Sequence, residues 1–320
     1  MRIAISGANG FVGRAVSSRA HSQGNHVIGI VRRPGVCDPY VHECVIDDDN
    51  FASVANGSRQ LDPCDVVIHL AARVHVMRDR AADPLAAFRA VNVDGSLNIA
   101  RAALRAGARR LVLVSSIKAL GEGEPGRPWR ENDEPMPTDP YGISKLESEL
   151  EVRKFGKAQG LEVVVVRPPL VYGRGVGANF LGLMKAIDKG IPLPLASVTA
   201  RRSLVYIENL ADSLLRCASD PRAAGECFHV ADDDALSIVE LLRSLGHGLD
   251  RPAKLFPVPV AVLQALGKLA GRAAVVDRLT SNLRLDTTHV RRTLNWQPPY
   301  TAQQGLEATA AWYRSRGIQK

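Results

Sequence analysis

The chain has 320 residues, of which 46% are hydrophobic and 23% are charged, and its formal net charge is +8. A chain of this length and apolar content can bury a substantial core, which excludes a disordered or fibrous protein. Its five cysteines are odd in number and lack C-x-x-C spacing, which argues against a disulfide framework or a zinc ribbon and favours a reduced, cytoplasmic compartment.

The first predicted element is a strand over residues 3–5, and no charged leader with a cleavage site precedes it, so we expect no secretory signal. A glycine-rich loop follows, and a helical pattern begins within it. In such a loop the first glycine permits a tight turn, the second lets the backbone approach a pyrophosphate, and the third lets the helix pack closely on the strand. The loop predicts a dinucleotide site made by Gly7, Asn9, Gly10, Phe11, Val12 and Gly13.

The second predicted strand, 27–31, ends where NAD sites usually carry an acidic residue about 20 positions beyond the glycine loop. Here Val31 takes that place, and Arg32 and Arg33 follow it. A guanidinium suits a 2′-phosphate, so the sequence favours NADP(H) as the cofactor, with NAD(H) as the alternative. The interpretation without function is that Arg32 and Arg33 are solvated loop charges. Asp47 follows a third apolar stretch and is predicted to meet the adenine, or to be a turn residue.

Further apolar runs at 66–70, 111–114 and 163–166 alternate with helical patterns at 88–106 and 145–159. This alternation predicts an α/β fold, a doubly wound parallel Rossmann sheet with helical crossovers. Ser115 and Ser116 follow the 111–114 run, where a parallel strand presents its carboxyl end to the ligand crevice. The proline-rich segment 121–139 is expected to be a long functional loop without an element of its own.

Tyr141 and Lys145 are four residues apart, so on a helix they share one face. The charge of Lys145 is expected to lower the pKa of the Tyr141 phenol and make it a usable acid or base near neutrality. Ser116 upstream favours this interpretation over a surface tyrosine and lysine.

After residue 167 the chain becomes richer in glycine and proline, which indicates a change of region. We predict a dinucleotide-binding Rossmann domain over 1–167, to which a segment near 203–225 returns, and a smaller, discontinuous C-terminal substrate domain over 168–320. Residues 228–230 resemble another short strand.

The most apolar later stretch, 256–270, is shorter than the roughly 20 residues that span a bilayer. A buried or groove-lining helix is expected there, with membrane-surface contact as the alternative.

The excess positive charge is compatible with a nucleic-acid partner, but the basic residues are scattered and lack interleaved aromatics. Steering of ligands that carry diphosphates is the favoured interpretation. The histidines show no ligand spacing, so no metal is expected, and His69 is interpreted as a structural histidine.

These motifs occur in the order seen in extended short-chain dehydrogenases/reductases, and the chain most resembles their nucleotide-sugar epimerase/dehydratase group, which includes UDP-glucose 4-epimerases. In residues 69–78 and 115–118, the sequence is similar to the sequences of bacterial surface-polysaccharide enzymes that act on UDP-N-acetyl-hexosamine derivatives. The resemblance implies a catalytic Ser116, Tyr141 and Lys145, a UDP-sugar substrate and a homodimer formed through the helices at 88–106 and 145–159. It also implies that further residues belong to the dinucleotide site, namely Leu70, Ala71, Ala72, Asn92, Tyr141, Lys145 and Pro168.

The resemblance also implies that Asn179 and Arg202 contact the substrate diphosphate beside Ser116 and Tyr141, with Arg278 as a further candidate. Ser203-Leu204 and Arg174 depart from the usual pattern of the group. Related dehydratases carry an Asp-Glu pair after the catalytic Ser/Thr, whereas this chain has Ile117-Lys118, so elimination chemistry is not expected. Lys118 is expected to face solvent.

Because the strand end at Val31 favours NADPH, the first expectation is reduction of the C4 ketone of a UDP-4-keto-6-deoxy-N-acetylhexosamine. The alternative is a UDP-sugar 4-epimerase, acting on UDP-glucose or UDP-N-acetylglucosamine, with resident NAD. A third reading is a non-catalytic dinucleotide-sensing protein, which the presence of Ser116, Tyr141 and Lys145 disfavours.

Overall fold

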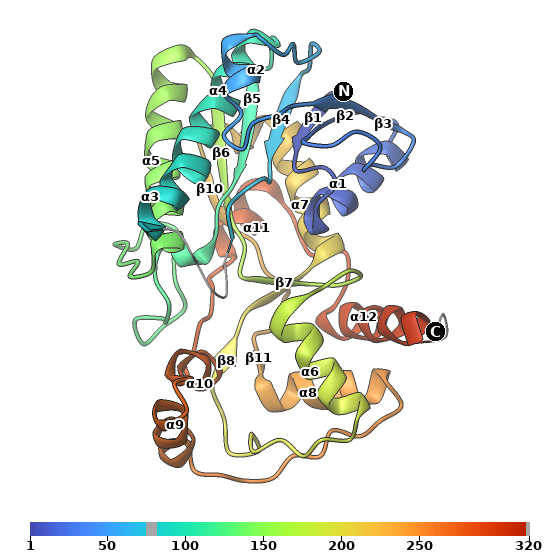
Figure 1. Ribbon diagram of the computed structural model, residues 1–320, viewed down its shortest axis with the longest axis vertical. Helices are drawn as coiled ribbons and strands as arrows, with labels where there is room; N and C mark the ends of the chain where they lie inside the picture. Colours follow the sequence, from blue (N-terminus) through green and yellow to red (C-terminus); the bar gives the residue numbers. More distant parts are fainter. Residues whose placement is uncertain (75–81, 318–320) are drawn as a thin grey trace.

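The computed structural model describes residues 1–74 and 82–317. Within them, seven strands form one parallel sheet in the order β10-β6-β5-β4-β1-β2-β3 (Figure 1). The predicted doubly wound Rossmann fold is confirmed. The strands are β1 (Arg2–Ser6), β2 (His26–Val31), β3 (Val41–Val45), β4 (Val66–His69), β5 (Arg110–Val114), β6 (Glu162–Arg167) and β10 (Cys227–His229).

Helices cover both faces of this sheet and bury the near-continuous apolar strands. One face packs against α1 (Phe11–Ser22), α7 (Ile207–Ser219) and α11 (Thr288–Leu294). The other packs against α2 (Ala52–Asn56), α4 (Gly95–Arg105) and α5 (Pro140–Gln159), with α3 (Pro84–Arg89) and the π-helical turn η1 (Ala90–Asp94) leading into α4. The helix predicted over 88–106 is therefore divided into three parts.

The rest of the chain lies beyond the carboxyl edge of the sheet (Figure 1). Two small sheets form there, in which β7 pairs with β9 in parallel and β8 pairs with β11 in antiparallel fashion. The elements are β7 (Leu170–Tyr172), α6 (Ala178–Asp188), β8 (Arg201–Arg202), β9 (Leu204–Tyr206), β11 (Leu236–Ser237), α8 (Ile238–Gly248), α9 (Val260–Leu269), α10 (Ala273–Thr280) and α12 (Ala302–Gly317). Two short 3₁₀ turns complete the description, η2 (Ile117–Ala119) and η3 (Pro221–Ala223).

The segment 203–225 divides between these parts. Its strand β9 pairs with β7 outside the main sheet, whereas its helix α7 lies against the main sheet beside α1. The predicted strand near 228–230 is present as β10 and joins the edge of the main sheet. The domain boundary at residue 167 stays a prediction.

The helix predicted within 256–270 is not buried. In α9 the side chains of Leu263 and Gly267 are buried, while Val262, Leu266 and Leu269 are 45%, 56% and 86% exposed. No helix in the described part of the chain is long and apolar enough to cross a membrane.

Candidate functional site

The glycine loop joins β1 to α1 at the carboxyl edge of the sheet. Gly7 has a φ of +71°, which a side chain would strain, and its N–H donates to the Ile30 carbonyl at 3.1 Å. A Cβ on Gly13 would lie 2.1 Å from the Gly7 carbonyl oxygen, so only glycine lets the helix approach the loop this closely. Gly10 is the N-cap of α1 and gives it no side-chain cap.

These features fit a dinucleotide. The first N–H groups of a helix have no intrahelical partner, and without a capping side chain they are available to anionic phosphate oxygens. Asn9 and Gly10 are exposed on this loop, with Phe11 and Val12 half-buried after them. The loop after β7 closes against it, because a Cβ on Gly175 would lie 3.4 Å from the Phe11 ring.

The strand end at Val31 differs from the expectation in one respect. Arg32 and Arg33 are exposed, but Arg32 forms an ion pair with the exposed Asp49. A carboxylate therefore lies beside this strand end, and this ion pair weakens the argument for a 2′-phosphate. Asp47, two residues before Asp49, is also exposed.

At the end of β4, His69 is fully buried and uses both ring nitrogens: Nδ1 bonds Ser6 Oγ at 2.5 Å and Nε2 bonds Ser96 Oγ at 3.0 Å. Burial lowers its pKa to about 3, so it is neutral. The prediction of a structural histidine is confirmed. Ser6 Oγ also accepts the Leu70 and Ala71 N–H groups, which fixes the backbone leading to Ala72. Of the stretch 69–78, residues 75–78 lie outside the described residues.

Asn92 lies on the π-helical turn and connects two parts of the site. Its Oδ1 accepts the Arg73 N–H at 2.8 Å, and its Nδ2 donates to the Arg73 carbonyl and to Ser144 Oγ. The side chain thus joins the segment after β4 to the helix that carries Tyr141. Its predicted contact with the dinucleotide stays a prediction.

Ser116 and Tyr141 are brought together, as predicted. Ser116 follows β5, and the Ile117 N–H donates to the Pro168 carbonyl at the end of β6, at 3.0 Å. The Tyr141 hydroxyl is buried and hydrogen-bonded with Ser116. Burial raises the pKa of Tyr141 to about 12, while the bond with Ser116 opposes this increase.

Lys145 is buried one helical turn below Tyr141, and its Nζ donates to the Val114 carbonyl at 2.8 Å. Burial lowers its pKa to about 8, and Glu149 on the next turn partly offsets this effect. The expectation that Lys145 brings the pKa of Tyr141 toward neutrality is not met in this structure, because desolvation raises that pKa and the opposing effect comes from the hydrogen bond with Ser116.

Lys118, expected to face solvent, is instead part of the site. It is half-buried and forms ion pairs with Glu122 at 2.9 Å and with Asp139, whose other carboxylate oxygen accepts the Gly142 N–H as the N-cap of α5. A Cβ on Gly142 would lie 2.5 Å from the Lys118 carbonyl oxygen. The start of the Tyr141 helix is thus held against the turn that carries Ser116.

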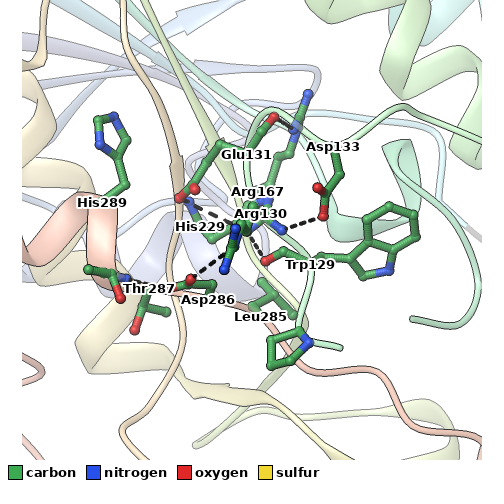
Figure 2. A network of polar contacts seen from close by, with 12 residues as sticks. Trp129, Arg130, Glu131, Asp133, Arg167, His229, Leu285, Asp286, Thr287 and His289 are labelled. Carbon is green, nitrogen blue, oxygen red and sulfur yellow. Dashed lines mark hydrogen bonds and ion pairs between the residues drawn. The ribbon is translucent and has the colours of Figure 1, made fainter. Parts of the chain in front are cut away.

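The loop 121–139 has no helix or strand, as predicted, and polar contacts hold it over the sheet (Figure 2). Arg167 at the end of β6 donates to the Glu131 carbonyl at 3.0 Å and forms a buried ion pair with Glu149 on α5. His229 on β10 donates its N–H to Glu131 Oε1 and contacts the Trp129 carbonyl through Nδ1. Burial lowers the pKa of His229 to about 3 and raises that of Glu131.

The predicted substrate residues lie in two places. Arg202 on β8 is half-buried and donates to the carbonyls of Arg278 and Ser281, at 2.9 and 3.1 Å. Burial and the neighbouring Arg278 charge lower its pKa to about 10. Asn179 is exposed in the first turn of α6. Their contact with a substrate stays a prediction.

Among residues 1–74 and 82–317, no cluster of His, Cys, Asp or Glu side chains has the arrangement to hold a metal ion. All five cysteines are free thiols. Ser115, next to Ser116, is buried, and its hydroxyl has no hydrogen-bond partner among the described residues.

Comparison with known proteins gives one consistent result. The model of the NAD dependent epimerase/dehydratase family matches residues 3–231. A UDP-glucose 4-epimerase of Vibrio cholerae is 40% identical over 312 residues, which cover 96% of this chain and 94% of the relative.

Solved structures share the fold at lower identity. UDP-glucose 4-epimerase of Thermotoga maritima, solved with UDP-glucose, has a TM-score of 0.78 at 21% identity and covers 99% of both chains. That of Thermus thermophilus, a complex with NAD, has a TM-score of 0.78 at 21% identity and covers 98% of this chain and 99% of its own.

Proposed function

The chain belongs to the NAD dependent epimerase/dehydratase family, and we propose that it is a UDP-hexose 4-epimerase whose NAD stays bound through the reaction. The observation that carries the proposal is the Ser116–Tyr141 pair at the carboxyl edge of the sheet, in a chain that matches a UDP-glucose 4-epimerase along nearly its whole length. The enzyme is dinucleotide-dependent, as its family is.

The choice of epimerase over 4-keto reductase depends on two findings. The relative at 40% identity is named for epimerisation. The Arg32 guanidinium, which favoured NADPH in the sequence, is paired with Asp49, and this carboxylate would repel a 2′-phosphate. NADPH-dependent reduction of a UDP-4-keto sugar is the second candidate, because Val31 still stands where NAD sites usually carry an acid.

The glycine loop would hold the pyrophosphate, and the segment 70–72, Pro168 and Lys145 would line the rest of the dinucleotide site. When bound, the nicotinamide ring supplies reversible hydride transfer, and its oxidised form carries a positive charge that favours phenolate over phenol.

Tyr141 takes the proton of the sugar C4 hydroxyl in one direction and returns it in the other, and Ser116 donates a hydrogen bond to the same oxygen. Lys145 adds positive charge beneath the phenol while its ammonium remains protonated, below a pH of about 8. Between removal of the C4 hydride and its return, the C4 ketone must present its other face, and this change of face inverts the carbon. Arg202 and Arg278 would bind the substrate diphosphate by charge-assisted hydrogen bonds.

The cofactor is tested by denaturing the purified protein and identifying the dinucleotide that it releases. The proposal predicts retained NAD, without NADP, and an Arg32→Ser, Arg33→Ser variant that retains NAD as well. An empty protein that binds NADPH much more tightly than NADH, and loses that preference in the variant, would instead establish the reductase.

Replacing Tyr141 by Phe removes the proton-transfer hydroxyl and leaves the ring that fills the site. Turnover should fall by at least about a hundredfold, because general acid–base catalysis contributes 10²–10⁴ in rate. Retained dinucleotide, measured after denaturation, serves as the control for folding. Full turnover in this variant would remove Tyr141 from the mechanism.

A further inference from the structure

The helix α9 exposes an apolar stripe that nothing in the described structure covers. Val262, Leu266 and Leu269 are spaced by four and three residues, so they lie on one side of the helix, and they are 45%, 56% and 86% exposed. An adjacent side, with Leu263 and Gly267, is buried against α10, where a Cβ on Gly267 would lie 2.6 Å from Val276. A helix that is apolar on both sides implies a second apolar environment.

Two neighbouring segments also carry exposed apolar residues. Phe256, before the helix, is 43% exposed, and Val275 on α10 is 45% exposed. The helix pair lies at the end of the molecule remote from the main sheet (Figure 1).

The charge around the stripe identifies the partner. Residues 260–276, which cover α9 and the first half of α10, contain no Asp or Glu, and their charged side chains, Lys268 and Arg272, are both exposed. Among the described residues neither of these two cations forms an ion pair with a carboxylate. A second copy of the same surface would be repelled by this charge, whereas an anionic bilayer attracts it.

We propose that α9 docks on the surface of an anionic membrane, the stripe entering the headgroup region and Lys268 and Arg272 meeting lipid phosphates. This is the arrangement of a peripheral helix that lies in the interface and does not span it. Because the Arg278 carbonyl on α10 accepts from Arg202, docking would bring the predicted diphosphate-binding arginines near the bilayer. The inference does not depend on the proposed function.

The test is co-sedimentation of the full chain with vesicles of phosphatidylcholine alone and of phosphatidylcholine mixed with phosphatidylglycerol. We expect binding to the anionic vesicles that weakens as salt rises. Two double variants, Leu266→Asp with Leu269→Asp and Lys268→Glu with Arg272→Glu, should each lower the partition coefficient by at least about tenfold. Leu170→Asp, which changes an exposed leucine on β7, should leave it unchanged.

Circular dichroism and the mass in solution complete the test. The variants should keep the far-ultraviolet spectrum and the mass of the parent protein, which separates lost docking from lost folding. Failure of the parent to bind anionic vesicles would overturn the proposal, as would unchanged binding by the leucine variant. A smaller mass in that variant would overturn it as well, because the stripe would then be an interface between copies.

Discussion

At the scale of single residues, burial decides the charges of the site more than charge pairing does. His69 and His229 are neutral because the ring is desolvated, and Tyr141 is a phenol for the same reason. Lys145 has its pKa lowered to about 8, close enough to neutrality for its charge to respond to a ligand. The direction of each pKa shift follows from how deeply the group is buried. The spacing of Tyr141 and Lys145 in the sequence does not reveal this depth.

His69 predicts how stability depends on pH. Its pKa is about 3 in the folded chain against 6.5 when exposed, so between these values the unfolded chain binds the extra proton and stability falls as pH falls. The contribution is about 1.4 kcal/mol per pH unit below roughly 6.5. Denaturant unfolding at several pH values between 7 and 5, roughly the range in which native structure persists, measures it.

The control for this slope is the variant His69→Asn, which has no titrating ring. Its free energy of unfolding should depend on pH less steeply than that of the parent by about 1 kcal/mol per pH unit. Equal slopes in the two proteins would show that His69 is protonated in the folded chain.

The residues that touch the reaction could be predicted because their chemistry is local in sequence. Ser116 follows a strand, and Tyr141 and Lys145 share a helix face, so topology alone brings them to one edge. Lys118 was assigned to solvent because its two carboxylate partners, Glu122 and Asp139, become neighbours only when the loop 121–139 folds back. The ion pair of Arg32 with Asp49 was missed for a related reason, since β3 must first lie beside β2.

At the scale of elements, the contact between the glycine loop and α1 leaves no space for a side chain at Gly13. Replacing Gly13 by Ala places a Cβ 2.1 Å from a backbone oxygen, and backbone cannot move aside as a flexible side chain can. We expect retained NAD to fall by about tenfold or more, measured as dinucleotide released per chain, since a shifted loop loses its N–H contacts with the pyrophosphate.

Gly182, in α6, is the matched position, because a Cβ there meets nothing within 4 Å. Gly182→Ala should keep the full amount of bound dinucleotide and should gain up to about 1 kcal/mol in stability from the better helix propensity of alanine. Equal loss of dinucleotide in both variants would contradict the role assigned to Gly13.

The elements themselves were predicted where apolar runs are continuous. The strands at 27–31, 111–114 and 163–166 were recognised in this way, whereas β3 was not among the predicted strands, because His42 and Glu43 interrupt its apolar residues. For α9, the buried reading of the stretch 256–270 was wrong: its apolar composition suits a core helix, but α10 covers only one side of it. The groove-lining and membrane-surface readings stay predictions.

At the scale of the whole molecule, one buried ion pair joins the sheet, the Tyr141 helix and the loop over the site. Arg167 and Glu149 have side chains 7% and 3% exposed, and Arg167 also holds the Glu131 carbonyl (Figure 2). Glu149→Gln would leave a buried guanidinium without its counter-charge, at a cost of about 3–5 kcal/mol in the free energy of unfolding.

Thermal or denaturant unfolding checks this value, with Glu151→Gln as the control on the exposed side of the same helix. That change should alter stability by no more than about 0.5 kcal/mol. A similarly small effect of Glu149→Gln would mean that the ion pair does not hold the three elements together.

The architecture of the whole chain was the part that sequence predicted best, because alternating strands and helices allow few topologies. The homodimer and the cytoplasmic location stay predictions. The reaction could not be decided from the sequence, because Ser116, Tyr141 and Lys145 serve reduction and epimerisation alike. The choice between the two reactions depended only on the cofactor inferred from the strand end at Val31.

The central claim is that the enzyme inverts C4 of a UDP-hexose without an external reductant. It is tested most directly by incubating the purified protein with UDP-glucose, and separately with UDP-N-acetylglucosamine, with no added dinucleotide, and following the sugar by proton NMR. We predict that the 4-epimer of at least one sugar forms until the two epimers reach a constant ratio, and that Tyr141→Phe forms none. No epimer from either sugar, together with NADPH oxidation when a UDP-4-keto sugar is supplied, would contradict the account and establish the reductase.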